Sequence, residues 1–323
     1  MLRLALHAER LIDRWRRPPR DPPVIDPYLG YASPDSLVVR GRVLTALRRT
    51  APDPEHGRLV NVRQMLSLFF TREVADVPVV SLSDDRRRAE SDDEGYFRLE
   101  LPRAAEPSGW HSVVIEIPGR HDTRVQAPVL IPRDDARFAI VSDIDDTLLK
   151  TGAYSLPRNL WTSLTGNALT RTVFPDAVEL LKRLHEEGRN PVYYVSSSPW
   201  NLHAFLERVF SENGLIRGPI ELRDFGLSEN KFIKSGHDHH KGDALDRLMV
   251  AHPGLRFVLI GDTGQQDPDV YAQVAARWPG RVAQVILREP RRRRSNATRR
   301  ALTRLDALNV STHIGSDFES ALH

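Results

Sequence analysis

The chain of 323 residues contains no cysteine. This absence excludes a disulfide framework, zinc sites built from thiolates and cysteine nucleophiles, and it leaves the redox compartment undecided. Lysine is also scarce, because almost every basic residue is arginine; the lysines are Lys150, Lys182, Lys231, Lys234 and Lys241. Where arginine is the default base, a lysine indicates a need for a compact point charge.

Long apolar runs are absent too. No window approaches the roughly 20 continuous apolar residues that a membrane-spanning helix needs. The first residues, MLRLALHAERLIDRWRRPP, carry charges too often for a signal-peptide core, so we expect a cytoplasmic protein. Walker A and GxGxxG sequences are missing, which weighs against nucleotide hydrolases and dinucleotide-binding enzymes. The length itself fits two domains.

Residues 1–33 are predicted to form a helix and a linker. An apolar stripe with arginine flanks indicates an amphipathic helix over Leu2–Arg17. Such a helix could lie on an anionic membrane or, as we favour, dock on its own protein or a partner subunit. The proline-rich stretch Pro18–Pro27 is typical of a linker.

Residues 34–136 are predicted to be a β-rich accessory domain. Phe97, Leu99 and Leu101 alternate with charged residues, which is the period of a half-buried strand. Similar short strands are expected at Val38–Leu44, Val77–Leu82, Val113–Ile117 and Val129–Ile131, with one helix near Val62–Val74. This pattern favours a small antiparallel β-sandwich. No catalytic constellation is visible in it, so a scaffold, a substrate-side wall and an interaction module all remain open.

Residues 137–323 alternate between strand and helix patterns, which predicts an α/β domain with a Rossmann-like parallel sheet. Expected strands are Phe138–Val141, Pro191–Val195, Ile220–Arg223, Arg256–Ile260 and Val282–Leu287. Expected helices lie near Asp176–Glu187, Trp200–Ser211, Lys241–Ala251, Asp267–Arg277 and Ala297–Leu308. The segment Thr151–Thr172 is too long for a simple turn and is placed to be a flap or small cap.

The stretch FAIVSDIDDTLLKTG, residues 138–152, carries the strongest signal. An apolar run of this kind is typical of a buried parallel strand, and ligands bind beyond the carboxyl ends of such strands. The run therefore places Asp143 and Asp145 at the carboxyl edge of the expected sheet. Two carboxylates held close repel each other unless a cation or a shared proton relieves them, and a bound divalent metal is the simplest explanation.

Three later segments place further polar groups at strand ends. The second expected strand ends in Ser196 and Ser197, which can bind a phosphate through hydroxyls and turn amides, although such a loop is more often a helix cap. Lys241 opens an expected helix, where its charge opposes the macrodipole, so it is not there for helix stability. If one lysine in this region is functional, Lys231 and Lys234 are alternatives to Lys241. The histidines His237, His239 and His240 fit no standard zinc spacing.

The fourth expected strand leads into Gly261-Asp262-Thr263-Gly264-Gln265-Gln266-Asp267. This is a second apolar strand followed by carboxylates. Asp262 and Asp267 thus offer hard oxygen ligands, which Mg²⁺ prefers.

Together these segments resemble the motifs of the haloacid-dehalogenase-like (HAD) phosphatases, in the same order. Asp143, Asp145 and Thr147 match motif I, Ser196 motif II, Lys241 motif III, and the Asp262 segment motif IV. The wording SDIDDT, SSSPW and LIGDTGQQDP is similar to the catalytic domain of Mg²⁺-dependent phosphatidate phosphatases of bacteria and fungi, including the actin-patch-associated fungal enzyme. This resemblance covers roughly residues 138–290, and the preceding β segment looks similar to the domain that accompanies it in bacterial members.

The resemblance implies a HAD-like fold and hydrolysis of a phosphomonoester through an aspartyl-phosphate. Asp143 would be the nucleophile and Asp145 the acid and base, while Thr147, Ser196, Ser197 and Lys241 would bind the phosphate. Mg²⁺ would be held by Asp143, the Asp145 carbonyl and Asp262, with Asp267 supporting them. The implied substrate is phosphatidate, and the arginines at 291–294, 299, 300 and 304 could contact an anionic membrane.

Two alternatives stay open. One is a HAD phosphatase acting on a sugar phosphate, nucleotide or phosphoprotein. The other is a non-catalytic scaffold that binds lipid or phosphate, although a binding module has little need for both a nucleophile and a separate acid. Nucleic acid is not an expected partner, and the sequence does not indicate an oligomeric state.

Overall fold

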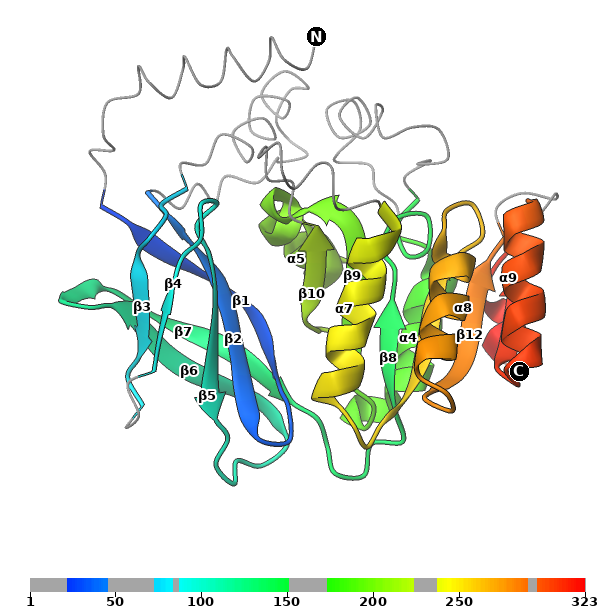
Figure 1. Ribbon diagram of the computed structural model, residues 1–323, viewed down its shortest axis with the longest axis horizontal. Coiled ribbons are helices and arrows are strands. Elements are labelled where there is room, and N and C mark those ends of the chain that lie inside the picture. The colour runs from blue at the N-terminus through cyan, green and yellow to red at the C-terminus, as the bar shows by residue number, and fades with distance from the viewer. Residues whose placement is uncertain are drawn as a thin grey trace, which may run out of the picture.

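The computed structural model describes residues 22–45, 73–83, 87–150, 173–223, 237–289 and 295–322. These residues form two sheets, one within residues 24–131 and one within residues 138–315 (Figure 1). No helix in these ranges is long and apolar enough to cross a membrane. Several predicted features lie outside them and stay predictions: the N-terminal helix, the helix near Val62–Val74, the flap Thr151–Thr172, Lys231, Lys234 and the arginines at 291–294.

The first sheet has seven strands in the order β4-β3-β6-β7-β1-β2-β5. Its strands alternate buried and exposed residues most clearly in β5, where Phe97, Leu99 and Leu101 are buried. This period of two is what places one face of a sheet on a core. The strands are β1 (Val24–Ala32), β2 (Ser36–Leu44), β3 (Pro78–Ser81), β4 (Arg88–Glu90), β5 (Tyr96–Pro102), β6 (Gly109–Ile117) and β7 (Arg120–Ile131).

Strand β1 corrects the predicted linker, which was wrong from Val24 onward. β1 pairs with β2 in antiparallel register over most of its length, and with β7 in parallel only at Gly30 and Tyr31. Pro27 has no backbone N–H to donate. Because it lies outside the short pairing of β1 with β7, this lack removes no hydrogen bond between those two strands. The sheet is therefore mixed, and the predicted sandwich of antiparallel strands stays a prediction.

The second sheet has six parallel strands in the order β10-β9-β8-β11-β12-β13. They are β8 (Phe138–Ser142), β9 (Val192–Pro199), β10 (Ile220–Arg223), β11 (Arg256–Asp262), β12 (Val282–Arg288) and β13 (Ser311–Gly315). Counted along the chain this is the order 3-2-1-4-5-6 of Rossmann-like folds, whose ligands bind where the order reverses. That point lies between β8, which Asp143 follows directly, and β11, which ends at Asp262.

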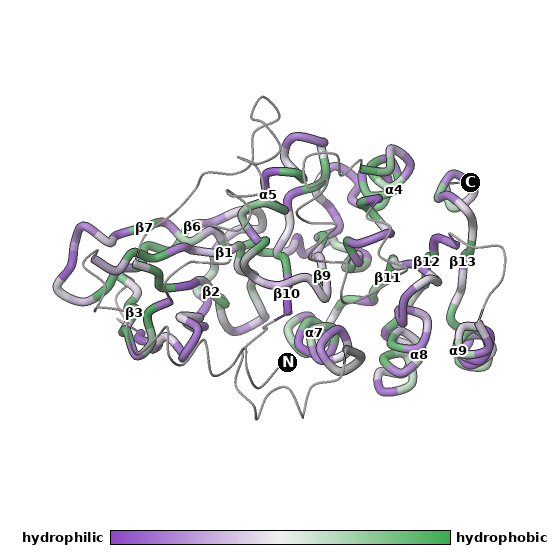
Figure 2. The backbone as a smooth tube through the Cα atoms, turned by 90° about the horizontal axis from the view of Figure 1, so that it is seen from above, coloured by the Kyte–Doolittle hydropathy of each residue, from purple (hydrophilic) through white to green (hydrophobic). Residues whose placement is uncertain are grey.

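Helices cover both faces of this sheet. Figure 2 shows α4 (Pro175–His185) and α5 (His203–Glu212) on one face, and α7 (His237–Ala251), α8 (Asp267–Arg277) and α9 (Asn296–Ala307) on the other. Local signals explain the helix starts: α4 and α8 have proline in the first turn, and the Ser295 hydroxyl caps α9 by accepting from the Thr298 N–H at 3.0 Å. Helix α7 begins at His237, so Lys241 lies in its second turn and does not open the helix as predicted.

The two sheets share part of their core. Tyr31 of β1 and Val38 of β2 belong to the same buried cluster as residues of β9 and α7. The Tyr31 ring meets the Tyr193 ring edge-on at 6.1 Å, and Arg40 of β2 forms a buried ion pair with Glu221 of β10. The first sheet therefore packs against the β10 end of the parallel sheet (Figure 1).

His252, which follows α7, makes stability depend on pH. It is buried with Nε2 2.7 Å from the Tyr193 hydroxyl, and burial, helped by the Arg281 charge, lowers the pKa of His252 to about 4. In the unfolded chain the His252 imidazole takes up a proton near pH 6.5, whereas in the folded protein it stays neutral until about pH 4. The neutral buried imidazole therefore contributes its full stabilisation above pH 6.5, and this contribution is lost as the pH falls toward 4. Between pH 7 and pH 5 we expect the free energy of unfolding to fall by about 1–2 kcal/mol less in His252→Gln than in wild type. Urea unfolding at both pH values measures this, and equal falls would contradict it.

Candidate active site

The first part of the site is the turn that follows β8. Asp143 is buried, and its N–H donates to the Ile260 carbonyl at 2.8 Å, which ties the turn to β11. Asp146 has a left-handed backbone with φ of 60°, a conformation that aspartate tolerates better than most residues. The chain then returns, and the Thr147 hydroxyl donates to Asp143 Oδ2 at 3.0 Å. Thr147, predicted to bind phosphate, thus orients the Asp143 carboxylate.

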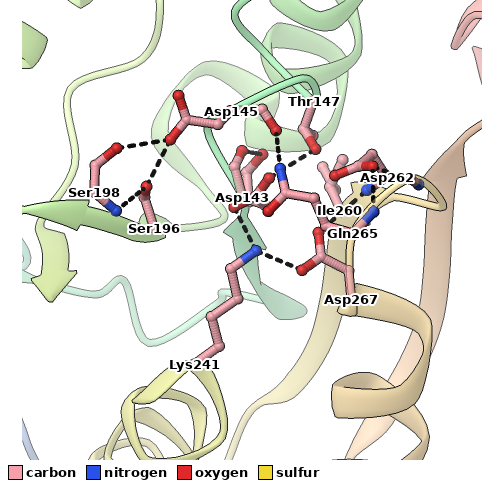
Figure 3. Close-up of polar contacts among 12 residues, drawn as sticks. Asp143, Asp145, Thr147, Ser196, Ser198, Lys241, Ile260, Asp262, Gln265 and Asp267 are labelled. Carbon is pink, nitrogen blue, oxygen red and sulfur yellow. Dashed lines mark hydrogen bonds and ion pairs between the residues drawn. The ribbon is translucent and has the colours of Figure 1, made fainter. Parts of the chain in front are cut away.

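Lys241 reaches this carboxylate from α7. Its Nζ lies 2.7 Å from Asp143 Oδ1 and 2.5 Å from Asp267 Oδ1, and all three residues are buried (Figure 3). Burial lowers the pKa of Lys241, but the Asp143 and Asp267 carboxylates outweigh this and raise it above its usual value. Burial raises the pKa of Asp143 well above its usual range, while the Lys241 charge opposes the shift and nearby carboxylates add to it. The amine therefore stays charged between the two acids.

Asp262 ends β11 beside this pair. The backbone N–H groups of Gly264 and Gln265 donate to its Oδ1 at 2.6 and 3.0 Å. Its buried Oδ2 has no hydrogen-bond partner among the described residues. Burial and the Asp267 charge raise the pKa of Asp262 to about 8, against the opposing Lys241 charge. Gly261 permits this packing, because a Cβ there would lie 2.5 Å from Asp267 Oδ2.

The acidic cluster has the donors of a divalent-cation site. One carboxylate oxygen each from Asp143, Asp262 and Asp267 lies within 4.8 Å of the others. A buried carboxylate oxygen without a partner is costly, and a hard cation that prefers oxygen ligands would satisfy it. The residues present therefore fit Mg²⁺. Asp145 is not part of this group through its side chain, and its backbone carbonyl accepts from the Gln265 amide at 3.0 Å.

Asp145 forms a second part of the site with the end of β9. The hydroxyls of Ser196 and Ser198 donate to Asp145 Oδ2 at 3.0 and 2.8 Å, and the Ser198 N–H donates to Ser196 Oγ at 2.9 Å (Figure 3). Ser196 thus contacts Asp145 in this structure, and Ser197, also predicted to bind phosphate, is partly exposed. Asp143 and Asp145 therefore face different neighbours. Asp143 lies against the charged amine of Lys241 and close to the other acids, whereas Asp145 accepts from two hydroxyls.

Sequence reasoning missed three supporting residues: Ser198, Gln265 and Arg288. Arg288 ends β12 with a buried guanidinium that donates to the Thr147 carbonyl at 3.3 Å and to Asp176 Oδ2 at 2.8 Å. Its charge lies over the rings of Phe174 and Phe318, at 4.0 and 4.2 Å. An arginine that closes an apolar strand at the edge of the site was the available signal.

Of His237, His239 and His240, only His240 has a described side chain, and it is not part of the acidic cluster. Within the ranges that the structure describes, the group able to hold a metal ion consists of Asp143, Asp262 and Asp267. His240 is partly buried, and burial lowers its pKa to about 4. The side chains of His237 and His239 lie outside what is described.

The fold and the site define an α/β protein with paired acidic residues at the switch point of a parallel sheet. Residues 138–289 match the family model described as the catalytic domain of phosphatidate phosphatase APP1. Over these residues the chain is similar to that family, in agreement with the resemblance seen in the sequence.

Two curated fungal proteins are similar over the same region. Phosphatidate phosphatase APP1 of Saccharomyces cerevisiae is 25% identical over 151 residues, which is 47% of this chain and 26% of the yeast protein. An uncharacterized Schizosaccharomyces pombe protein is 30% identical over 166 residues, 51% of this chain and 26% of that protein. The chain thus matches about a quarter of the length of each relative.

Among solved structures, a β-phosphoglucomutase described as putative, from Thermotoga maritima, aligns with 55% of this chain and 94% of its own. Its TM-score is 0.31 and its identity 11%, which is too weak a likeness to bear on the fold.

Proposed function

We propose that this protein is a Mg²⁺-dependent phosphomonoester hydrolase that acts through an aspartyl-phosphate, with phosphatidate as its substrate and diacylglycerol and phosphate as products. The observation that carries the proposal is the separation of Asp143 and Asp145 into two environments. Asp143 lies against Lys241, and Asp145 against Ser196 and Ser198. A double displacement needs one carboxylate as nucleophile and another as acid and base. The similarity of residues 138–289 to the phosphatidate phosphatase catalytic domain supports the substrate.

In the first step an Asp143 oxygen attacks phosphorus and the bond to the ester oxygen breaks. The Thr147 hydroxyl at 3.0 Å holds the carboxylate in orientation for this attack. The departing oxygen takes a proton from Asp145. Lys241 lies beside the nucleophile, so its charge also offsets the negative charge on the transferred group.

In the second step Asp145 takes a proton from water, which attacks the same phosphorus. The bond between phosphorus and the Asp143 oxygen breaks, phosphate leaves and the carboxylate is restored. Ser196 and Ser198 keep Asp145 at a fixed place for both proton transfers.

Asp143 and Asp262 would hold the cation, together with the Asp145 carbonyl if Gln265 releases it, and Asp267 would support them. When bound, Mg²⁺ supplies positive charge that offsets the acids and stabilises the transferred phosphoryl oxygens. The buried Asp262 Oδ2 supports this assignment.

A lipid substrate requires contact with a membrane surface. Arg299, Arg300 and Arg304 are exposed on α9. Basic residues near an anionic surface contribute about 1 kcal/mol each. We therefore place peripheral membrane contact on this helix. The test replaces these three arginines with glutamine and measures sedimentation with phosphatidate vesicles. If the variant sediments as well as wild type does, α9 is not the membrane contact.

The test is phosphate release from phosphatidate in mixed micelles, with Mg²⁺ or with a chelator, beside a sugar phosphate, a nucleotide and a phosphopeptide. We expect release from phosphatidate to exceed release from the soluble esters at least about tenfold and to disappear on chelation. Release from a soluble ester alone would keep the mechanism and discard the lipid. No release from any of them would favour a non-catalytic scaffold.

A further inference from the structure

We propose that Tyr28, in the first sheet, is a positioning residue for the segment Ser196–Trp200, which comprises the end of β9 and the residue after it and is called the serine loop below. The inference rests on the proposed function, because this loop holds the acid and base Asp145. It assigns the accessory sheet a part in the chemistry: its aromatic side chains fix the end of β9, and the end of β9 fixes Asp145.

The contact is a ring stack across the two sheets. The Tyr28 ring is buried and lies 4.8 Å from the Trp200 ring with an angle of 6° between their planes. It also lies 4.1 Å from the ring of His203, the first residue of α5. Stacked aromatic pairs contribute free energy beyond the area that they bury. One side chain of β1 therefore holds both sides of the turn that joins β9 to α5.

The serine loop needs such support because the sheet gives it little. β9 pairs with β8 only over Val192–Tyr194, before the serines begin. On its other side, the pairing with β10 is irregular between Glu221 and Arg223. Trp200 follows Pro199 directly and is two residues from Ser198, whose hydroxyl contacts Asp145. A shift of the Trp200 ring is therefore transmitted to Ser198 through one fixed proline.

Two more residues of the first sheet enclose Trp200. The guanidinium of Arg40 on β2 lies 5.7 Å from the Trp200 ring, and the Tyr96 ring on β5 lies 5.9 Å from it. Arg40 is itself fixed by its ion pair with Glu221 and by a 3.0 Å hydrogen bond to the Leu29 carbonyl. Side chains from three neighbouring strands, β1, β2 and β5, thus meet at one ring of the second sheet's domain.

A second interdomain contact serves as a matched control. The Arg217 guanidinium lies over the Trp110 ring of β6 at 4.3 Å. Arg217 precedes β10, so this contact lies at the amino edge of the parallel sheet, opposite the serine loop. Loss of either contact weakens the interface, but only the loss of the Tyr28 contact should loosen Ser196–Trp200.

The experiment compares Tyr28→Ala, Tyr28→Phe and Trp110→Ala in the full chain. Amide hydrogen exchange of peptides covering residues 192–202 reports on the loop without requiring activity. We expect exchange there to rise at least about fivefold in Tyr28→Ala and to stay at the wild-type rate in the other two variants. With a hydrolysed substrate, kcat should fall about 10- to 100-fold in Tyr28→Ala with a smaller change in KM, because Asp145 is misplaced. In Tyr28→Phe, which keeps the ring, kcat should stay at the wild-type value.

Unchanged exchange in Tyr28→Ala overturns the proposal, and so does an equal rise in Trp110→Ala, since that would reflect general loosening of the interface. With an active wild type, a normal kcat in Tyr28→Ala also overturns it. Raised exchange confined to Tyr28→Ala in a protein without phosphatase activity would support the positioning and refute the proposed function, so the two failures are distinguishable.

Discussion

Replacing Asp143 with asparagine should reduce phosphate release by at least about 10⁴-fold, because the amide cannot form the aspartyl-phosphate. The fold should survive, since asparagine has the same shape and can still accept from the Thr147 hydroxyl. The substitution also removes one of the clustered buried carboxylates whose mutual repulsion helps to raise the pKa of Asp143. Steady-state rates with phosphatidate, together with urea unfolding, measure both expectations.

The matched control is Asp269→Asn, which makes the same change of charge on the same edge of the sheet. Asp269 is in the first turn of α8, and its side chain accepts from the Gln273 amide at 2.7 Å. Its loss should leave the rate within about twofold of wild type. An Asp143→Asn enzyme with near-wild-type turnover would show that another group attacks phosphorus.

Replacing Lys241 with methionine should destabilise the metal-free protein by about 3–5 kcal/mol. The reason is that Asp143 and Asp267 each lose their cationic partner while they stay buried. The carboxylates would respond by taking up protons, so the loss should be larger at pH 8 than at pH 5. Urea unfolding in the presence of a chelator measures the loss.

Mg²⁺ should restore part of this stability, because a bound cation takes over the role of the missing amine. Lys182→Met is the control: Lys182 is exposed in the last turn of α4, and its loss should change the free energy of unfolding by less than about 0.5 kcal/mol. An unaltered free energy of unfolding in Lys241→Met would mean that the amine does not compensate the acids.

The parallel sheet could be predicted because most of its strands are apolar runs buried on both faces. β8 is a clear case, with four buried residues of five. The strands that were missed lack this signal. β1 contains Asp26 and Pro27, and β13 reads STHIG and is only partly buried. Their places follow from pairing with distant strands, which no local pattern contains.

The site could be predicted at the level of which strand ends meet. Asp143, Lys241, Asp262 and Asp267 come together because parallel strands end at one edge and α7 packs beside them. The directions of side chains could not be predicted. Asp145 points toward Ser198 and away from the acidic cluster, and Gln265 reaches the Asp145 carbonyl across the switch point. Such choices depend on the packed backbone, which a sequence pattern does not specify.

Arg288 makes the loop that carries Asp143 depend on residues that are synthesised much later. Its guanidinium joins the Thr147 carbonyl to the Ser316 carbonyl, and Asp176, which it also binds, accepts from the Phe318 N–H at 2.7 Å. The ribosome makes Thr147 long before it makes Ser316 and Phe318. The loop that carries Asp143 therefore gains these supports only after β13, Ser316 and Phe318 have been made, so the candidate site cannot be complete while the chain ends before Phe318.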